Sequence, residues 1–154
     1  MSQVINDSVI QTHAHYLLTD SRKVTSPKES IFFAISGLHH DGHEFLQELY
    51  QKGVREFVVE RPTSSSDLKA MPDAKIWQVE SSLAALQQLA AAHRQRFSIP
   101  VVGITGSNGK TIVKEWLYQL LSKSYNVVRS PKSYNSQLGV PLSVWQLNES
   151  HTMA

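Results

Sequence analysis

A glycine-rich segment between an apolar run and a helical pattern constrains the fold of this chain more than any other feature. The segment reads Gly103-Ile-Thr-Gly-Ser-Asn-Gly-Lys-Thr111 and follows the apolar run Ile99-Pro-Val-Val102. Glycine and small residues let the backbone curl, so that several N–H groups and the positive end of the following helix point at one spot. Strand, glycine-rich loop and helix in this order indicate an α/β fold with a phosphate-binding loop.

Two side chains at the end of the segment indicate the chemistry. Lys110 places a positive charge beside the curled backbone, and Thr111 offers a hydroxyl where a magnesium ion would sit. The usual pattern, G-x-x-x-x-G-K-[ST], is met at Gly109 and the two residues after it, whereas its first glycine position holds Ile104. We therefore expect an ATP or GTP site; the alternative is a glycine-containing turn with a chance lysine.

The composition narrows the class of protein. With 154 residues and 41% hydrophobic residues, the chain fits one ordinary domain or two small modules around a packed core. The net charge is only +2 and no long basic run occurs, which argues against nucleic acid or a membrane surface as the main partner. Cysteine is absent, residues 1–7 lack the pattern of a secretory signal, and no apolar run approaches the ~20 residues of a membrane span. We expect a cytoplasmic protein without membrane insertion.

Short apolar runs alternate with helical patterns along the first half, which predicts an α/β module. We expect strands at residues 31–35, 57–59 and 76–79, and helices at residues 43–52 and 81–96. Gly53 is placed to end the first of these helices. Pro62 to Asp67, rich in serine, predicts a surface loop. Ser98 and Pro100 mark the junction at which we place a module boundary.

The second module reads as the beginning of a larger fold. We expect strands at residues 99–104 and 127–128, and helices at residues 110–123 and 138–147. A phosphate-binding fold also needs a carboxylate on a later strand, but the only acidic residues after Thr111 are Glu115 and Glu149. We therefore expect an N-terminal fragment whose second module is truncated; the alternative is a small complete protein with degenerate nucleotide binding.

Four motifs together resemble the Mur ligase family. The phosphate loop resembles its T-G-[TS]-N-G-K-[TS] element, and Asp20-Ser-Arg-Lys-Val24 resembles its D-S-R-x-V segment. Ile31 to Gly37, followed by Asp41-Gly-His-Glu-Phe45, resembles F-x-A-x-x-G…D-G-H-x-F. Asn135-Ser-Gln-Leu-Gly-Val-Pro141 resembles the N-N-x-x-G-V-P element of the MurF branch, with Ser136 in place of the second asparagine.

The resemblance implies an ATP-dependent amide ligase of peptidoglycan precursor synthesis. That branch joins D-Ala-D-Ala to UDP-N-acetylmuramoyl-tripeptide: ATP phosphorylates the carboxylate, and the amine then attacks the acyl phosphate. Residues 1–97 would form a small α/β domain that binds the UDP-muramoyl peptide. Residues 98–154 would begin the central parallel-sheet ATPase domain, and the protein would be monomeric. The fragment alone would be inactive.

The resemblance also assigns roles to individual residues. Lys110 and Thr111 would be catalytic, with Thr111 on Mg²⁺. The residues implied for ATP are Thr105, Gly106, Ser107, Asn108, Gly109, Lys110, Thr111 and Asn135. The residues implied for the UDP substrate are Ser21, Arg22, Gly37, Asp41, Gly42 and His43.

Without the resemblance, Asp20-Ser-Arg22 reads as a capped turn and Asp41-Gly-His43 as an ordinary helix start. The close spacing of His39, His40 and His43 is compatible with a metal site, but we interpret them as solvated side chains of a loop, because no carboxylate or cysteine set completes a ligand shell. Three rival functions also stay open. They are the MurE branch, which adds the third amino acid, a small-molecule phosphotransferase, and a non-catalytic binding module.

Overall fold

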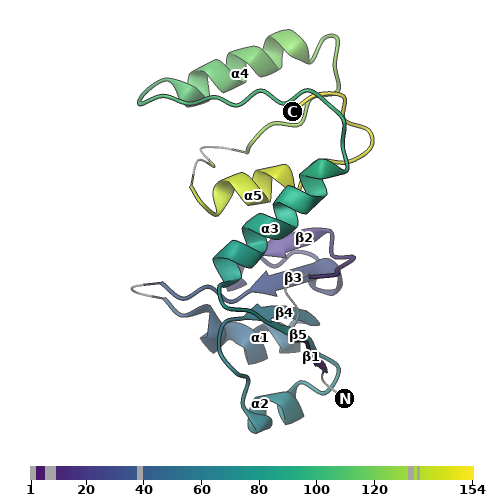
Figure 1. Ribbon diagram of the computed structural model, residues 1–154, viewed down its shortest axis with the longest axis vertical. Coiled ribbons are helices and arrows are strands. Elements are labelled where there is room, and N and C mark those ends of the chain that lie inside the picture. The colour runs from purple at the N-terminus through teal and green to yellow at the C-terminus, as the bar shows by residue number, and fades with distance from the viewer. Residues whose placement is uncertain (1–2, 6–9, 38–39, 132–133, 135) are drawn as a thin grey trace. The chain divides into compact units, whose positions relative to one another are not determined.

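The computed structural model describes residues 3–5, 10–37, 40–131, 134 and 136–154, with residues 3–5 described by their backbone alone. The chain divides into two compact units, residues 1–89 and 90–154 (Figure 1). The expected boundary near residue 98 stays a prediction. Among the described residues, no helix is long and apolar enough to cross a bilayer.

A five-stranded parallel sheet forms the centre of the first unit (Figure 1). Its strands are β1 (Gln3–Ile5), β2 (Tyr16–Leu18), β3 (Ser30–Phe33), β4 (Glu56–Val59) and β5 (Lys75–Gln78). They lie in the order β1-β5-β4-β3-β2, and all four neighbouring pairs are parallel. The strands expected at residues 31–35, 57–59 and 76–79 are thus confirmed as β3, β4 and β5.

Short helices connect these strands. They are the 3₁₀ turns η1 (Ser21–Lys23), η2 (Pro27–Glu29) and η3 (Gly42–Phe45), and the α-helices α1 (Leu46–Gln51) and α2 (Ser65–Ala70). The longer helix α3 (Ser82–Gln95) follows β5. The helix expected at residues 43–52 is therefore a 3₁₀ turn that continues as α1. Gly53 follows it with φ of 106°, a left-handed value that favours glycine and ends the helix.

The surface loop expected at residues 62–67 is wrong, because α2 begins within it. Ser64 caps this helix: its hydroxyl accepts the N–H of Asp67 at 3.1 Å. The hydroxyl thereby satisfies one of the backbone donors that a helix start leaves open. Serines that indicated a loop are thus the start signal of a helix.

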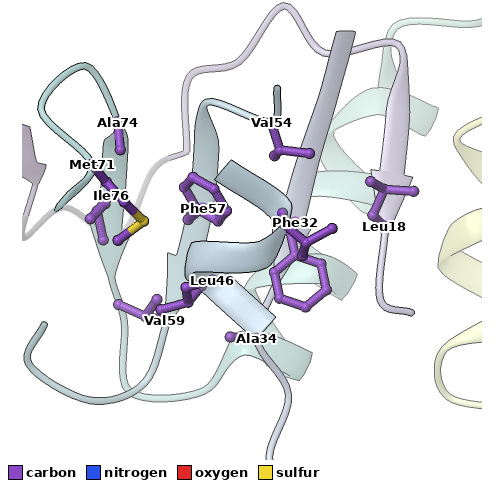
Figure 2. Packing of buried hydrophobic residues seen from close by; sticks show 11 residues of the cluster. Leu18, Phe32, Ala34, Leu46, Val54, Phe57, Val59, Met71, Ala74 and Ile76 are labelled. Carbon is purple, nitrogen blue, oxygen red and sulfur yellow. The ribbon is translucent and has the colours of Figure 1, made fainter. Parts of the chain in front are cut away.

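The core of the first unit lies where the middle strands meet α1 (Figure 2). Phe32, Phe57 and Ile76 come from β3, β4 and β5 and are fully buried, and Leu46 of α1 packs with them. Strands of a parallel sheet are covered on both faces, so their sequences read as continuous apolar runs. Burying each such side chain contributes about 1.5–3 kcal/mol, which makes this cluster the main source of stability in the unit.

The second unit contains the helices α4 (Lys110–Leu121) and α5 (Gly139–Val144). Pro141 is tolerated in the first turn of α5, because the N–H that proline lacks has no partner within a helix there. On α4, Ile112, Trp116 and Leu120 are spaced four residues apart, so they share one face, and all three are exposed.

The strands expected at residues 99–104 and 127–128 are wrong. The backbone N–H of Val102 donates to the carbonyl of Ala154 at 2.8 Å, and the N–H of Ala154 donates to the carbonyl of Pro100 at 3.1 Å. Val127 forms only an isolated bridge with Met153. A strand needs a row of paired backbone groups, and Met153 and Ala154 provide only these few bonds to the two segments.

Candidate functional site

The carboxyl ends of the parallel strands gather the residues expected to bind the UDP substrate. Ser21 and Arg22 follow β2, whereas Gly37 and the turn at residues 41–43 follow β3. Because neighbouring parallel strands end at the same edge, the segments after β2, β3 and β4 lie along that edge. Such an edge is the usual ligand site of an open α/β sheet.

Asp20 and Arg22 form a two-point ion pair in the turn after β2. Arg22 Nε donates to Asp20 Oδ1 and Nη2 donates to Oδ2, each at 2.9 Å. Asp20 also caps η1 by accepting the N–H of Arg22 at 3.1 Å. These contacts, the side-chain hydrogen bond from Arg22 above all, lower the pKa of Asp20 to about 2. The Arg22 side chain is 86% exposed, whereas Ser21 is buried, so the arginine is the one held toward solvent.

A second network holds the turn after β3. His43 Nδ1 lies 2.7 Å from Asp41 Oδ1, and His43 Nε2 accepts the N–H of Glu60 at 3.0 Å. Nε2 therefore carries no proton, so Nδ1 donates to the carboxylate. Arg61 Nη1 donates to Asp41 Oδ2 at 2.7 Å. The hydrogen bond from His43, with a smaller contribution from Arg61, lowers the pKa of Asp41.

These contacts change what the sequence indicated for this turn. Both ring nitrogens of His43 have partners within the chain and its side chain is only 13% exposed, so it holds the turn in place. Glu60 and Arg61 were not predicted, although their position directly after β4 could have shown them. Glu60 also contacts the start of α3, since its Oε1 accepts the N–H of Ser82 at 2.8 Å.

Gly42 is needed for close packing. A Cβ there would lie 2.7 Å from the backbone nitrogen of Ile35 and 2.8 Å from Cα of Ala34. Gly37 closes the same loop, because its N–H donates to the carbonyl of His40 at 2.8 Å. His39 lies outside the described residues, and the rest of the described chain holds no cluster of three metal-ligating side chains.

The phosphate loop has the curled backbone that its sequence predicts. Gly106 has φ of 138° and Gly109 has φ of 76°, both in the region that favours glycine. Gly109 is the N-cap of α4 and provides no side-chain cap to the first turn. Lys110 folds back over the loop, where its Nζ donates to the carbonyls of Gly106 and Ser107. Thr105, Ser107, Asn108 and Thr111 are exposed.

A pocket of about 620 Å³ lies beside this loop within the second unit. Thr105, Gly106, Lys110 and Thr111 line it, whereas Ser107, Asn108 and Gly109 do not. Its charged lining residues are Arg94, Lys110, Lys114 and Arg129, and no Asp or Glu of the described chain lines it. Most other lining residues are apolar, and Lys114 and Arg129 are paired with Glu115, so the positive charge of the pocket comes chiefly from Lys110 and Arg94. Asn135, expected on the ATP side, lies outside the described residues.

Glu115, whose direction the sequence left open, is held between two cations. Its Oε1 lies 3.1 Å from Lys114 Nζ, and its Oε2 pairs with Arg129. The guanidinium of Arg129 also stacks over the ring of Tyr118, 4.0 Å from the centroid. Lys114 Nζ donates to the carbonyl of Ser130 at 2.7 Å. These contacts tie α4 to residues 129–130, on a second side of the pocket.

Comparison with known proteins shows the same family in both units. The model for the Mur ligase family, catalytic domain, matches residues 13–94, and that for the Mur ligase middle domain matches residues 104–154. Two relatives are UDP-N-acetylmuramoyl-tripeptide–D-alanyl-D-alanine ligases. The one from Synechocystis is 36% identical over 138 residues, 90% of this chain and 29% of the relative. The one from Bacillus subtilis is 32% identical over 149 residues, 97% of this chain and 31% of the relative.

Solved structures agree with this comparison. A MurF from Acinetobacter baumannii is 31% identical with a TM-score of 0.81, and the match covers 96% of this chain and 31% of that one. A MurF ligase from Thermotoga maritima, solved in complex with ADP, is 35% identical with a TM-score of 0.74 over 90% of this chain and 30% of that one. The chain thus spans about a third of the length of these relatives. Because one family model alone covers more than half of its residues, the chain belongs to the Mur ligase family.

Proposed function

We propose that this chain provides the UDP-substrate region and the first part of the ATP site of the ligase that joins D-Ala-D-Ala to UDP-N-acetylmuramoyl-tripeptide. The observation that carries the proposal is that relatives named for this reaction match both units of the chain at once. The curled phosphate loop supports it, because this reaction needs a nucleotide triphosphate. In this proposal, residues 1–97 bind the UDP substrate and residues 98–154 begin the ATP-binding domain.

The phosphate loop would bind ATP through backbone N–H groups of residues 105–109 and through the open first turn of α4. Lys110 would exchange its two carbonyl acceptors for the terminal phosphates, and each such charge-assisted bond contributes about 1.5–3 kcal/mol. Its larger effect would be to stabilise charge on the phosphoryl group during transfer. Thr111 fits one ligand position of Mg²⁺, which would neutralise phosphate charge, and Asn135 would lie on the ATP side.

The chemistry explains why a carboxylate needs this site. A carboxylate is a poor electrophile, since its negative charge repels the attacking amine. Phosphorylation removes that charge and provides phosphate as the leaving group. The residues of the chain would then act by holding the phosphoryl donor and the carboxylate in line and by offsetting negative charge.

The sheet edge of the first unit would bind the UDP moiety through Ser21, Arg22, Gly37, Asp41, Gly42 and His43. Arg22 suits the diphosphate, because its planar fork can pair with two oxygens. His43 and Gly42 would act by shaping the turn that carries Asp41. We place the protein in the cytoplasm as a monomer, where both of its substrates would reach it from solution.

The test is ATP-dependent phosphate release by the full-length protein, given UDP-N-acetylmuramoyl-tripeptide and D-Ala-D-Ala. We expect release only with both substrates, and we expect Lys110→Ala to lower turnover by about 10²-fold or more through lost charge stabilisation. Lys123→Ala, at an exposed lysine beyond the end of α4, is the matched control and should keep normal turnover.

The same assay separates the rival functions. Release with the UDP-dipeptide and a free diamino acid would instead support the MurE branch. Phosphorylation of a small metabolite without phosphate release would support a phosphotransferase. Binding of UDP-muramoyl ligands without any turnover would support a non-catalytic module.

A further inference from the structure

Lys114 lies four residues, about one helical turn, after Lys110 on the same face of α4, and both side chains line the pocket beside the phosphate loop. The Lys114 side chain is only 15% exposed. Its Nζ donates to the main-chain carbonyl of Ser130 at 2.7 Å. Because the acceptor is main chain, this contact does not depend on which side chain occupies position 130.

The neighbouring residues of α4 strengthen the same connection. Glu115 contacts both Lys114 and Arg129, so the carboxylate joins the two cations that line this part of the pocket. Tyr118, a further turn along α4, stacks against the Arg129 guanidinium. Three side chains of one helix, Lys114, Glu115 and Tyr118, therefore hold residues 129–130.

We propose that Lys114 is a positioning residue of the nucleotide site. Lys114 holds the main chain at Ser130 against α4, and the phosphate loop lies directly before that helix. Lys114 thereby sets the distance between the phosphate loop and residues 129–130, which form one wall of the pocket. The inference rests on the proposed function for its catalytic consequence. Loss of the Lys114 contact would displace residues 129–130 by a fraction of an ångström and weaken their contacts with the bound nucleotide. Such contacts matter most during phosphoryl transfer, so kcat should fall more than KM for ATP rises.

The experiment compares Lys114→Met, Lys114→Arg and the control Lys123→Met in the full-length protein. We expect Lys114→Met to lower kcat by about tenfold while KM for ATP changes by less than about threefold, a smaller loss than that of Lys110→Ala. Lys114→Arg should recover most of the activity, since a guanidinium can still donate to the Ser130 carbonyl. Lys123→Met should match the wild type.

Amide hydrogen exchange of residues 126–130 provides a second readout that needs no turnover. We expect faster exchange in Lys114→Met, restored by Lys114→Arg and unchanged in Lys123→Met. Unchanged exchange in Lys114→Met, or a kcat within twofold of the wild type, would overturn the inference. A wild-type protein that lacks the proposed ligase reaction would overturn the proposed function, and the exchange result would still decide the role of Lys114.

Discussion

His43 and Asp41 form a hydrogen bond of 2.7 Å between Nδ1 and Oδ1, and the same imidazole accepts the backbone N–H of Glu60 through Nε2 at 3.0 Å. One ring therefore joins the turn after β3 to the end of β4. It does so as a neutral tautomer whose two nitrogens have different partners. The edge of the sheet that we propose for the UDP substrate is held in shape by this ring.

Replacing His43 by alanine should destabilise the first unit by about 1–3 kcal/mol, because it leaves the half-buried Glu60 N–H without its acceptor. Urea denaturation followed by circular dichroism measures the change as a lower midpoint. His13→Ala is the matched control, since His13 is exposed. Equal midpoints for the two variants would contradict the structural role of His43.

Gly42→Ala should destabilise the first unit by about 1–3 kcal/mol. The added Cβ would lie 2.7 Å from the Ile35 nitrogen and 2.8 Å from the Ala34 Cα, so the backbone of one loop must move. Gly103→Ala is the control, because a Cβ at that position meets no atom within 4 Å. Thermal unfolding of both variants tests the prediction, which fails if Gly103→Ala lowers Tm as much as Gly42→Ala does.

The Asp20–Arg22 pair should make the free energy of unfolding depend on pH in the acid range. The pKa of Asp20 is lowered in the folded chain from 3.8 to about 2, so the unfolded chain takes up this proton first as pH falls. The stabilisation is complete above about pH 4 and is lost as pH falls toward 2. Because the Arg22 side chain is 86% exposed, solvent screens the pair and we expect its contribution to stability to be small.

The measurement for this pair is the free energy of unfolding at pH 6 and at pH 2.5 for the wild type, Asp20→Asn and Arg22→Ala. Both variants should be less stable than the wild type at pH 6, and the difference should shrink at pH 2.5. A difference that stays constant with pH would show that the charge of Asp20 is not responsible.

Arg22→Ala should also weaken binding of a UDP-muramoyl ligand by about 10- to 100-fold while leaving ATP binding intact. Loss of one two-point contact to a diphosphate corresponds to about 1.5–3 kcal/mol. Lys23→Ala removes the same charge from the same turn but no planar fork, so it should weaken binding less. Titration calorimetry with each ligand measures both effects, and equal loss of both ligands would indicate a folding defect instead.

The sequence predicted the middle of the sheet well and its edges poorly. Strands β3, β4 and β5 are buried on both sides, so each appears as a continuous apolar run. β2 spans only Tyr16–Leu18, too short for a pattern to be visible. The segment 99–104 has a strand-like composition, but whether such a run becomes a strand depends on partners that composition does not reveal.

The candidate site divides in the same way. Gly106, Gly109 and Lys110 were predictable, because a curled loop before a helix requires glycine and a nearby cation at fixed spacing. The position of Arg61 directly after β4 was visible in the sequence, but its contact with Asp41 was not, since that contact joins segments twenty residues apart. Lys114 was not, because only the fold shows that its ammonium reaches Ser130.

The exposed face of α4 provides the chain with an optical reporter. Trp116 is 63% exposed, whereas Trp77 is 1% exposed inside the first unit. A small soluble quencher such as acrylamide should therefore extinguish the red-shifted emission of Trp116 long before it reaches Trp77. Any polypeptide that covers Ile112, Trp116 and Leu120 would shift that emission to the blue and shield it. With the half-buried Trp145 replaced by phenylalanine, fluorescence would register the moment at which this face leaves water.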